Sequence, residues 1–417
     1  MRRTLFRIFL LAGALAYMAV LSANVMGAWY LDQPNVEKLS RGLRWNPGNP
    51  LLWTQYGSYR LYASGGSESK QAEDAFLRAA AMNPLDPANW NGLATAYLQM
   101  RESRKAEAAL RALLVAVPLL PQSAWRLGNF LLVADQPKEA FPYLRAAAAT
   151  EVGLRWPLFD LAWKILDDPE DILRGLIPDD PEAREEYLRF LMYRRKLTEA
   201  DAVWREVRSN HGKDALKLGS AYVDALVASG MGAEAAKVWE ALLADTGRAG
   251  AKPAGELLTN GDFEAGLPNV GLDWRLVPGA GYEIGLDDSV FQAGAHSLRV
   301  TFDGTANVDF AAVQQMVPVE PNQEYRFQAY LKTENITTDN GVLFGVVTAG
   351  GAPGDSAVFK SENRVGTNPW RLEQLDFRTG PKTRFVQVVL RRYGSSKFNN
   401  LIQGKVWMDS VTLRARP

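Results

Sequence analysis

The chain opens with a long apolar run that follows three arginines. No charged residue occurs between positions 8 and 31, and Trp29-Tyr30 lies near the end of the run. As a helix, residues 8–25 would rise about 27 Å, close to the ~30 Å thickness of bilayer hydrocarbon. This pattern predicts a membrane-spanning helix within 1–31, with the arginines in the cytoplasm and the aromatic pair at the opposite membrane surface.

A cleaved secretory signal would leave a similar pattern at the N-terminus. Leu-Ser-Ala at 21–23 and Val-Met-Gly at 25–27 are acceptable small-residue cleavage sites. The apolar run is longer than the ~7–15 residues of a signal core, which favours a retained single-pass anchor. Either interpretation places the bulk of the chain outside the cytoplasm, and cleavage would make the protein a secreted one.

Residues 32–247 show helical periodicity that repeats along the chain. One unit opens with Asn-Pro-Leu-Asp-Pro-Ala-Asn-Trp at 83–90, and the unit before it opens with Asn-Pro-Gly-Asn-Pro-Leu-Leu-Trp at 46–53. Pro84 and Pro118 are 34 residues apart, which is the tetratricopeptide period. We therefore predict an all-α solenoid of antiparallel helix pairs, which binds a protein partner on its repeat surface.

Tryptophans recur at the repeat positions of this segment. Because they occupy positions that face neighbouring helices, we predict that they pack rather than contact a ligand. The tryptophans concerned are Trp53, Trp90, Trp125, Trp204 and Trp239.

The hydrophobic period changes near residue 250. The stretch 248–255 is rich in Gly, Ala and Pro and predicts a linker. Beyond it, apolar and polar residues alternate, as in Tyr-Arg-Phe-Gln-Ala-Tyr-Leu-Lys at 325–332. About eight such strands, separated by turn residues, predict an all-β two-sheet sandwich over 256–417.

Composition narrows the chemistry of this multidomain chain. Its 417 residues include no cysteine and two histidines, and Lys+Arg equals Asp+Glu at 47 each. Absence of cysteine excludes disulfides, thiol nucleophiles and zinc-thiolate sites, and a balanced charge argues against nucleic-acid binding. No Walker loop, Gly-x-Ser-x-Gly or His-Glu-x-x-His motif occurs. We therefore predict that the protein is not an enzyme.

Two motifs at the ends of the β region carry a family resemblance. Leu-Thr-Asn-Gly-Asp-Phe-Glu at 258–264 and Val-Trp-Met-Asp-Ser-Val at 406–411 resemble a carbohydrate-binding-module jelly roll of the galactose-binding-like group. Together with the anchor and the repeats, the chain resembles bacterial envelope proteins of exopolysaccharide and O-antigen assembly systems. The resemblance implies an inner-membrane scaffold, with its bulk periplasmic or extracellular, that binds polysaccharide or oligosaccharide. A purely protein–protein scaffold and a glycoside-active enzyme are the alternatives.

The resemblance also implies a structural calcium ion. In the family, the positions that match Glu264 and Asp409 often share such an ion, and calcium prefers several oxygen ligands. The closing motif here is Asp-Ser where many relatives have Asp-Asp, so one potential ligand is missing. The alternative is that both residues are hydrogen-bonded turn carboxylates without a metal.

Strand alternation suggests where a glycan would bind. The polar positions of 325–332 and 385–391 are expected to leave the core, and a tyrosine follows the second strand. Aromatic rings suit the apolar face of a sugar, and amides and guanidinium groups suit its hydroxyl or acidic groups. The alternative is a solvated sheet face. The candidate glycan-binding residues are Arg326, Gln328, Tyr330, Gln387, Arg391 and Tyr393.

Overall fold

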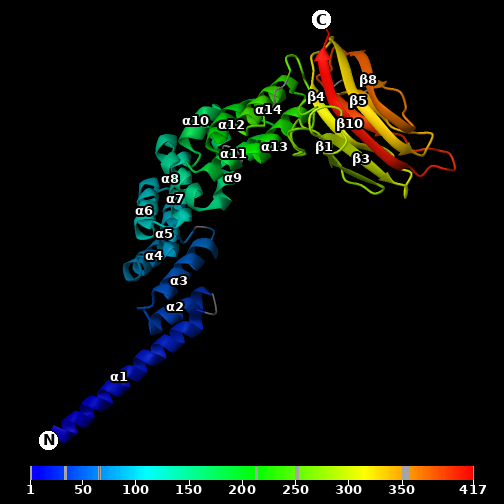
Figure 1. Cartoon of the computed structure of the whole chain (residues 1–417). Helices are drawn as coiled ribbons and strands as arrows, with labels where there is room; N and C mark the ends of the chain where they lie inside the picture. Colours follow the sequence, from blue (N-terminus) through cyan, green and yellow to red (C-terminus); the bar gives the residue numbers. More distant parts are fainter. Residues whose placement is uncertain are drawn as a thin grey trace. The chain divides into compact units, whose positions relative to one another are not determined.

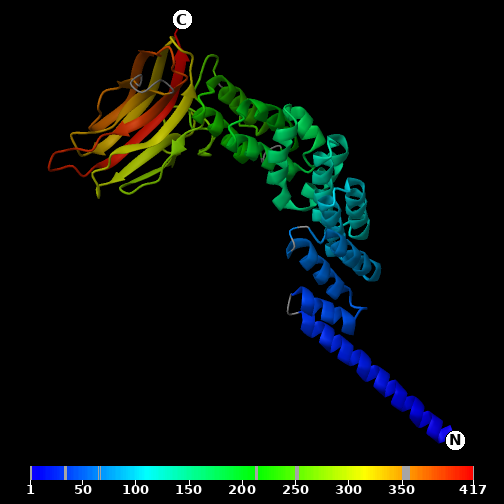
Figure 2. The same cartoon turned by 180° about the vertical axis from the view of Figure 1, so that it is seen from behind.

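The computed structural model describes residues 2–31, 35–63, 65, 67–211, 215–248, 253–349 and 357–416. It divides into two compact units, Met1–Tyr187 and Leu188–Pro417. Within the described residues, fourteen α-helices precede ten strands. Figures 1 and 2 show the helices in the blue-to-green part of the chain and the strands in the yellow-to-red part. The order of elements confirms the predicted fold class, an all-α array followed by an all-β sandwich.

The first unit is built of helices. They are α1 (Arg2–Leu31), α2 (Val36–Trp45), α3 (Pro50–Ala63), α4 (Ser69–Met82), α5 (Pro87–Gln99), α6 (Ser103–Ala116), α7 (Pro121–Val133), α8 (Pro137–Thr150), the 3-10 helix η1 (Val152–Leu154), α9 (Arg155–Ile165), α10 (Pro169–Gly175) and the start of α11 (Pro181–Tyr193). Helix α1 is long and apolar enough to cross a membrane from Arg7 to Leu31. The rings of Trp29 and Tyr30 lie edge to face, with their centres 4.8 Å apart, and Tyr30 also packs against Gly42 of α2.

Large and small residues fit together at the crossings of the helices. Phe76 of α4 lies over two glycines, Gly57 of α3 and Gly92 of α5. A Cβ atom at Gly92 would lie 2.3 Å from the ring of Phe76, so this position requires glycine. Gly128 of α7 makes the same fit with Leu144 of α8, at 2.6 Å. These pairs explain why the 34-residue period of the sequence produces stacked helix pairs.

The repeat tryptophans differ in burial. Trp204 and Trp239 are buried, each with 2% of its surface exposed. Trp53, Trp90 and Trp125 are only half-buried, which differs from the expected core position. The indole N–H groups of Trp53 and Trp90 donate to the carbonyls of Pro47 and Pro84, at 2.8 and 2.7 Å. Each of these two rings therefore holds the turn that precedes its own helix.

The second unit contains three complete helices and the sandwich. The helices are α12 (Leu197–His211), α13 (Ala215–Ala228) and α14 (Gly232–Asp245). The strands are β1 (Arg275–Leu276), β2 (Tyr282–Asp287), β3 (Ser297–Asp303), β4 (Phe310–Pro318), β5 (Glu324–Ile336), β6 (Leu343–Ala349), β7 (Val358–Lys360), β8 (Gly366–Arg378), β9 (Phe385–Arg392) and β10 (Gln403–Ala415). Sequence periodicity suggested about eight strands. Strands β1 and β7 have two and three residues, too few for a period to show.

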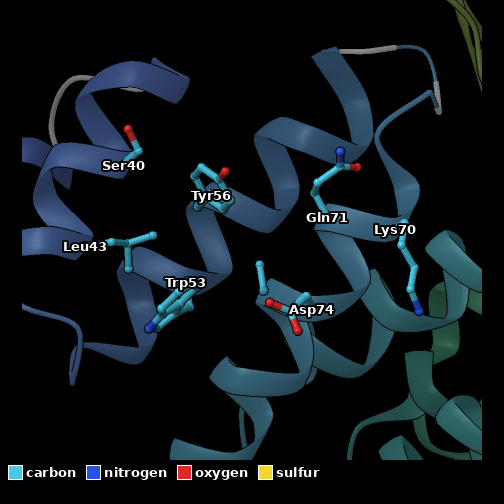
Figure 3. A pocket seen from close by; sticks show the side chains of 8 residues that line it. Ser40, Leu43, Trp53, Tyr56, Lys70, Gln71 and Asp74 are labelled. Carbon is cyan, nitrogen blue, oxygen red and sulfur yellow. The ribbon is translucent and has the colours of Figure 1, made fainter.

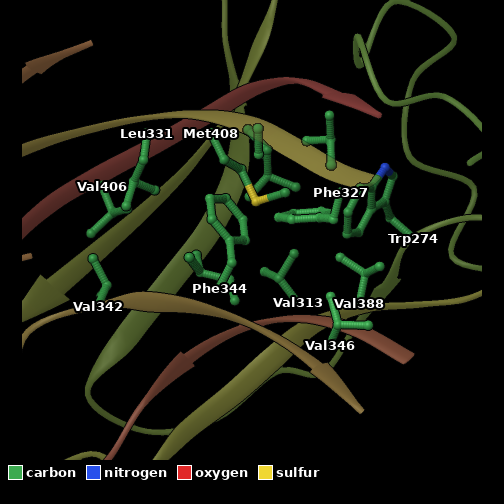
Figure 4. Packing of buried hydrophobic residues seen from close by; sticks show 14 of the residues in the cluster. Trp274, Val313, Phe327, Leu331, Val342, Phe344, Val346, Val388, Val406 and Met408 are labelled. Carbon is green, nitrogen blue, oxygen red and sulfur yellow. The ribbon is translucent and has the colours of Figure 1, made fainter. Parts of the chain in front are cut away.

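Two five-stranded antiparallel sheets form the sandwich. One has the order β2-β3-β10-β5-β8 and is called the β5 sheet, and the other has the order β1-β4-β9-β6-β7 and is called the β9 sheet. Figure 4 shows side chains of both sheets meeting in the core, with Phe327 and Met408 from the β5 sheet and Phe344 and Val388 from the β9 sheet. Trp274 is fully buried beside them.

Helices α13 and α14 pack directly on the sandwich within this unit. The indole N–H of Trp239 donates to Oγ1 of Thr259 at 3.1 Å. Gly271, which has a φ of +54°, lies so close to the Trp239 ring that a Cβ would be 2.3 Å away. Asp224 of α13 pairs with Arg275 of β1 at 2.5 Å. The compact unit that holds the sandwich therefore begins within α11, well before the linker expected at 248–255.

Candidate binding surfaces

The structure places the six candidate glycan-binding residues on two different surfaces. Strand β5 and strand β9 belong to different sheets, and their apolar residues meet in the core between them. The polar side chains of the two strands therefore leave the sandwich in opposite directions. The outer face of the β5 sheet carries Arg326, Gln328 and Tyr330, and the outer face of the β9 sheet carries Gln387 and Arg391, with Tyr393 just beyond β9.

On the β5 face, the polar side chains bind one another. Nε and Nη2 of Arg326 donate to the two carboxylate oxygens of Asp376 at 2.7 and 2.8 Å. The hydrogen bond from Arg326 lowers the pKa of Asp376. Nε2 of Gln328 donates to Oε1 of Gln374 at 3.0 Å, and Tyr330 lies opposite Leu372. Cross-strand pairs of this kind stabilise a sheet, and they leave the guanidinium already neutralised by a carboxylate.

On the β9 face, a tyrosine lies between two cations. The Cζ atom of Arg391 and the Nζ atom of Lys360 lie 4.3 and 4.4 Å from the ring centre of Tyr393. The Lys360 ammonium, which hydrogen-bonds the phenol, lowers the pKa of Tyr393. Arg391 also pairs with Asp309, whereas no described carboxylate lies within ion-pair distance of Lys360. The face thus carries an exposed ammonium beside a phenol, with no partner carboxylate among the residues that the structure describes.

Amide groups continue this surface toward the other end of β9. Nε2 of Gln387 donates to Oε1 of Gln314 on β4. At the far end Phe385 is buried and lies against Gly232, at the start of α14. The accessible part of the β9 face is therefore its Arg391 and Tyr393 end. Sequence reasoning missed Lys360, because its strand β7 is too short to show a hydrophobic period. It also missed Gln314, because this residue becomes a neighbour of Gln387 only through the pairing of β4 with β9.

The two carboxylates expected to bind calcium hold the loop at 291–296 instead. Oε1 of Glu264 accepts the backbone N–H groups of Ala295 and His296 at 2.7 and 3.0 Å. Oδ2 of Asp409 accepts those of Gln292 and Ala293 at 2.7 and 3.1 Å. The Ala295 N–H lowers the pKa of Glu264, whereas burial raises the pKa of Asp409.

This donor set does not fit a calcium ion in the arrangement seen. Calcium takes about six to eight oxygen ligands, and both carboxylates are directed at N–H donors. Within the part of the chain that the structure describes, no group of three His, Asp or Glu residues could hold a metal. The geometry corresponds to the metal-free alternative, and calcium binding stays a prediction from the resemblance.

A groove in the first unit is the candidate site for a protein partner. It has a volume of about 600 Å³ and lies along α2, α3 and α4. In Figure 3 the rings of Trp53 and Tyr56 lie between Leu43 of α2 and Asp74 of α4. Arg78 covers Trp53, with its Cζ atom 4.9 Å from the ring centre. The groove therefore has an aromatic floor beside polar groups, a combination that suits a peptide.

A second cavity, of about 610 Å³, lies between α14 and the opening motif of the sandwich. Trp239 and Thr259 line it, and so does Asp273, which is only 1% exposed. Burial raises the pKa of Asp273 to about 6. Its Oδ1 atom accepts the backbone N–H of Trp274 at 2.7 Å. This carboxyl belongs to the contact between the helices and the sandwich.

No protein-family model matches the sequence, and no curated protein matches it either. Among solved structures, a family 16 carbohydrate-binding module is 19% identical, with 38% of this chain and 98% of that chain covered and a TM-score of 0.27. The CBM22-1 xylan-binding domain from Paenibacillus barcinonensis Xyn10C is 16% identical over 37% of this chain and 90% of its own, with a TM-score of 0.27. YrrB, a TPR protein with an unusual peptide-binding site, is 15% identical over 52% of this chain and 95% of its own, with a TM-score of 0.26. The chain is thus similar to solved structures of both kinds that its sequence resembles.

Proposed function

We propose that this protein is a non-catalytic, membrane-anchored scaffold of the bacterial cell envelope that binds glycan on the β9 face and a protein partner in the groove of α2–α4. The observation that carries the glycan site is the exposed Lys360 beside Tyr393 on the β9 face. The β5 face also has a lysine over a ring, but there Lys332 is half-buried and Trp407 is buried. On the β5 face Arg326 is neutralised by Asp376, whereas on the β9 face the exposed Lys360 lies beside Tyr393 without a carboxylate among the described residues.

The chemistry of the β9 face favours an acidic glycan. Ammonium and guanidinium groups bind carboxylates or phosphates, and amides and a phenol bind sugar hydroxyls. Lys360, Arg391, Tyr393 and Gln387 supply these groups on one surface. An acidic exopolysaccharide chain matches this set better than a neutral one, and it agrees with a role in exopolysaccharide assembly.

Affinity electrophoresis of the full chain in detergent tests the glycan site. Gels would contain alginate as an acidic polysaccharide or dextran as a neutral one. We expect alginate to retard the protein and Lys360→Ala to lose most of that retardation. Lys405→Ala is the matched control, because it removes the same charge from an exposed position of β10 in the other sheet.

The other outcomes of this experiment contradict the proposal in different ways. Loss of binding in Tyr330→Ala with Lys360→Ala unaffected would place the site on the β5 face. No retardation by any polysaccharide would leave a purely protein–protein scaffold. Release of reducing sugar from a polysaccharide by the purified protein would support a glycoside-active enzyme.

The partner groove is tested in cells with a photo-crosslinking residue. Gln71 lines the groove, and Gln122 is an exposed glutamine on α7, away from it. We expect a discrete crosslinked protein from position 71 and none from position 122. Equal products from both positions would show that the groove is not the contact surface.

A further inference from the structure

Helix α1 has two parts with different surroundings. Its apolar residues from Ile8 to Leu21 are exposed, as expected for a segment without a protein neighbour. From residue 23 onward one face of the same helix turns inward. The inward residues are Ala23, Met26, Gly27, Tyr30 and Leu31. Their spacing of three and four residues places them on a single stripe of an α-helix.

This stripe is packed as the first helix of the repeat array. Tyr30 and Leu31 lie against a small core formed by Leu39, Leu43 and Leu52 of α2 and α3. Close approach of the helices is possible because the contact positions on α1 and α2 include glycines. A Cβ at Gly27 would lie 3.3 Å from Asn46, and one at Gly42 would lie 3.0 Å from Tyr30.

The contacts also give the direction of α2 relative to α1. Gly42 touches Tyr30, whereas Asn46, one turn later, touches Gly27 and donates from Nδ2 to Oδ1 of Asn24 at 2.9 Å. The two helices are therefore antiparallel. The turn between α2 and α3 consequently lies at the level of Asn24, next to the segment of α1 in which one face begins to turn inward.

Two large apolar side chains are exposed on either side of this turn. Trp45 ends α2 and is 54% exposed, and Leu51 begins α3 and is 52% exposed. Arg44, next to Trp45, is exposed as well. Tryptophan concentrates at membrane–water interfaces, and arginine near a membrane surface is attracted by anionic headgroups.

We propose that α1 passes from the bilayer directly into the first helical pair, so that the α2–α3 turn, with Trp45 and Leu51, lies in the headgroup region of the same membrane. This inference rests on the membrane anchoring proposed above. The proposal requires that α1 is retained: cleavage after Ala23 or Gly27 would leave Tyr30 and Leu31 on the core of Leu39, Leu43 and Leu52, but would remove the exposed apolar residues that enter the bilayer. The first repeat would stand on the membrane surface without an intervening linker.

Depth measurements on the full chain test the contact, and the absence of cysteine makes labelling at one position straightforward. Leu51→Cys and Tyr62→Cys are a matched pair, since both side chains are exposed and lie in the first and last turns of α3, about 16 Å apart along its axis. Each variant would carry a polarity-sensitive fluorophore in vesicles of phosphatidylcholine and phosphatidylglycerol. We expect lipids with a spin label in the headgroup to quench position 51 several-fold more than position 62.

Equal quenching at both positions would overturn the proposal, and so would a mature protein whose N-terminus, measured by mass spectrometry, lies after residue 23. Vesicle flotation of the same samples separates this result from failure of the anchoring itself. Protein that does not float is not anchored, and both proposals then fail. Protein that floats with equal quenching is anchored, and only the contact of the first repeat is wrong.

Discussion

Arg392 is the largest charged side chain in the sandwich interior, with 0% of its surface exposed. Its guanidinium donates to neutral acceptors on three loops, among them the carbonyl of Asn340 at 3.1 Å, Oδ1 of Asn307 at 2.9 Å and the carbonyl of Asn400 at 3.2 Å. Burial lowers the pKa of Arg392. Its inward direction continues the alternation of Val386, Val388 and Leu390, but its partners on the loops could not be predicted from the sequence.

Asp273 gives the protein a specific dependence of stability on pH. The folded state holds the pKa of this carboxyl at about 6, above its ordinary 3.8, because the side chain is buried. Between pH 4 and pH 6 the folded state therefore binds a proton that the unfolded state releases, and stability falls as the pH rises. We expect Asp273→Asn to stabilise the second unit at pH 7.5 by up to about 3 kcal/mol and to change little at pH 4.

Calorimetric unfolding of the full chain at pH 4 and pH 7.5 measures this difference. Asp288→Asn is the control, because Asp288 is an exposed carboxylate in the same sandwich. An asparagine at 273 can still accept the Trp274 N–H, so the variant keeps that hydrogen bond. Equal destabilisation of the Asp273→Asn protein at both pH values would show that ionisation of Asp273 does not lower the free energy of unfolding.

At the scale of elements, strand alternation predicted correctly which side chains of β5 and β9 leave the core. It could not show that the two strands face opposite ways, because β5 pairs with β8 and β10 while β9 pairs with β4 and β6. These pairings join segments far apart in the sequence, and periodicity within a strand carries no information about them. The six candidate residues consequently separated into two groups of three.

The loop at 291–296 allows a direct test of the calcium prediction. Glu264 and Asp409 hold it through backbone N–H groups, and Glu264 also contacts Nδ1 of His296 at 3.0 Å, so both carboxylates have partners without a metal. We therefore expect a calcium chelator to leave the Tm of the full chain unchanged. Asp409→Asn should lower the Tm in chelator and in calcium alike, because it weakens two charge-assisted hydrogen bonds of about 1.5–3 kcal/mol each. A fall of several degrees on chelation alone would instead support the ion implied by the family resemblance.

At the scale of the whole molecule, the order of apolar N-terminal helix, helical repeats and sandwich could be predicted because each has its own hydrophobic pattern. The association of the last helices with the sandwich could not, since it depends on single contacts such as Trp239 against Gly271. Balanced charges, 47 of each sign, leave no net field to attract a ligand over long distance. The glycan binding that we propose for the β9 face would therefore depend on local groups.

The compact unit Leu188–Pro417 predicts how fragments of the protein should behave. A fragment of residues 256–417 would expose the surface on which Trp239 lies and lose the ion pair between Asp224 and Arg275. A fragment of residues 188–417 would keep both. We expect the longer fragment to unfold at the temperature of the corresponding transition in the full chain, and the shorter one to unfold several degrees lower.

Trp239→Ala in the longer fragment is the matched variant for this comparison. Removal of a buried tryptophan costs about 3–5 kcal/mol, and the Trp239 ring of α14 contacts Gly271 and donates to Thr259 in the sandwich. If the helices stabilise the sandwich, the variant should lower the unfolding temperature of the strands as well as that of the helices. Circular dichroism in the near and far ultraviolet measures both unfolding temperatures. Separate transitions, with the strands unaffected, would show that the helices and the sandwich are independent domains despite their contact.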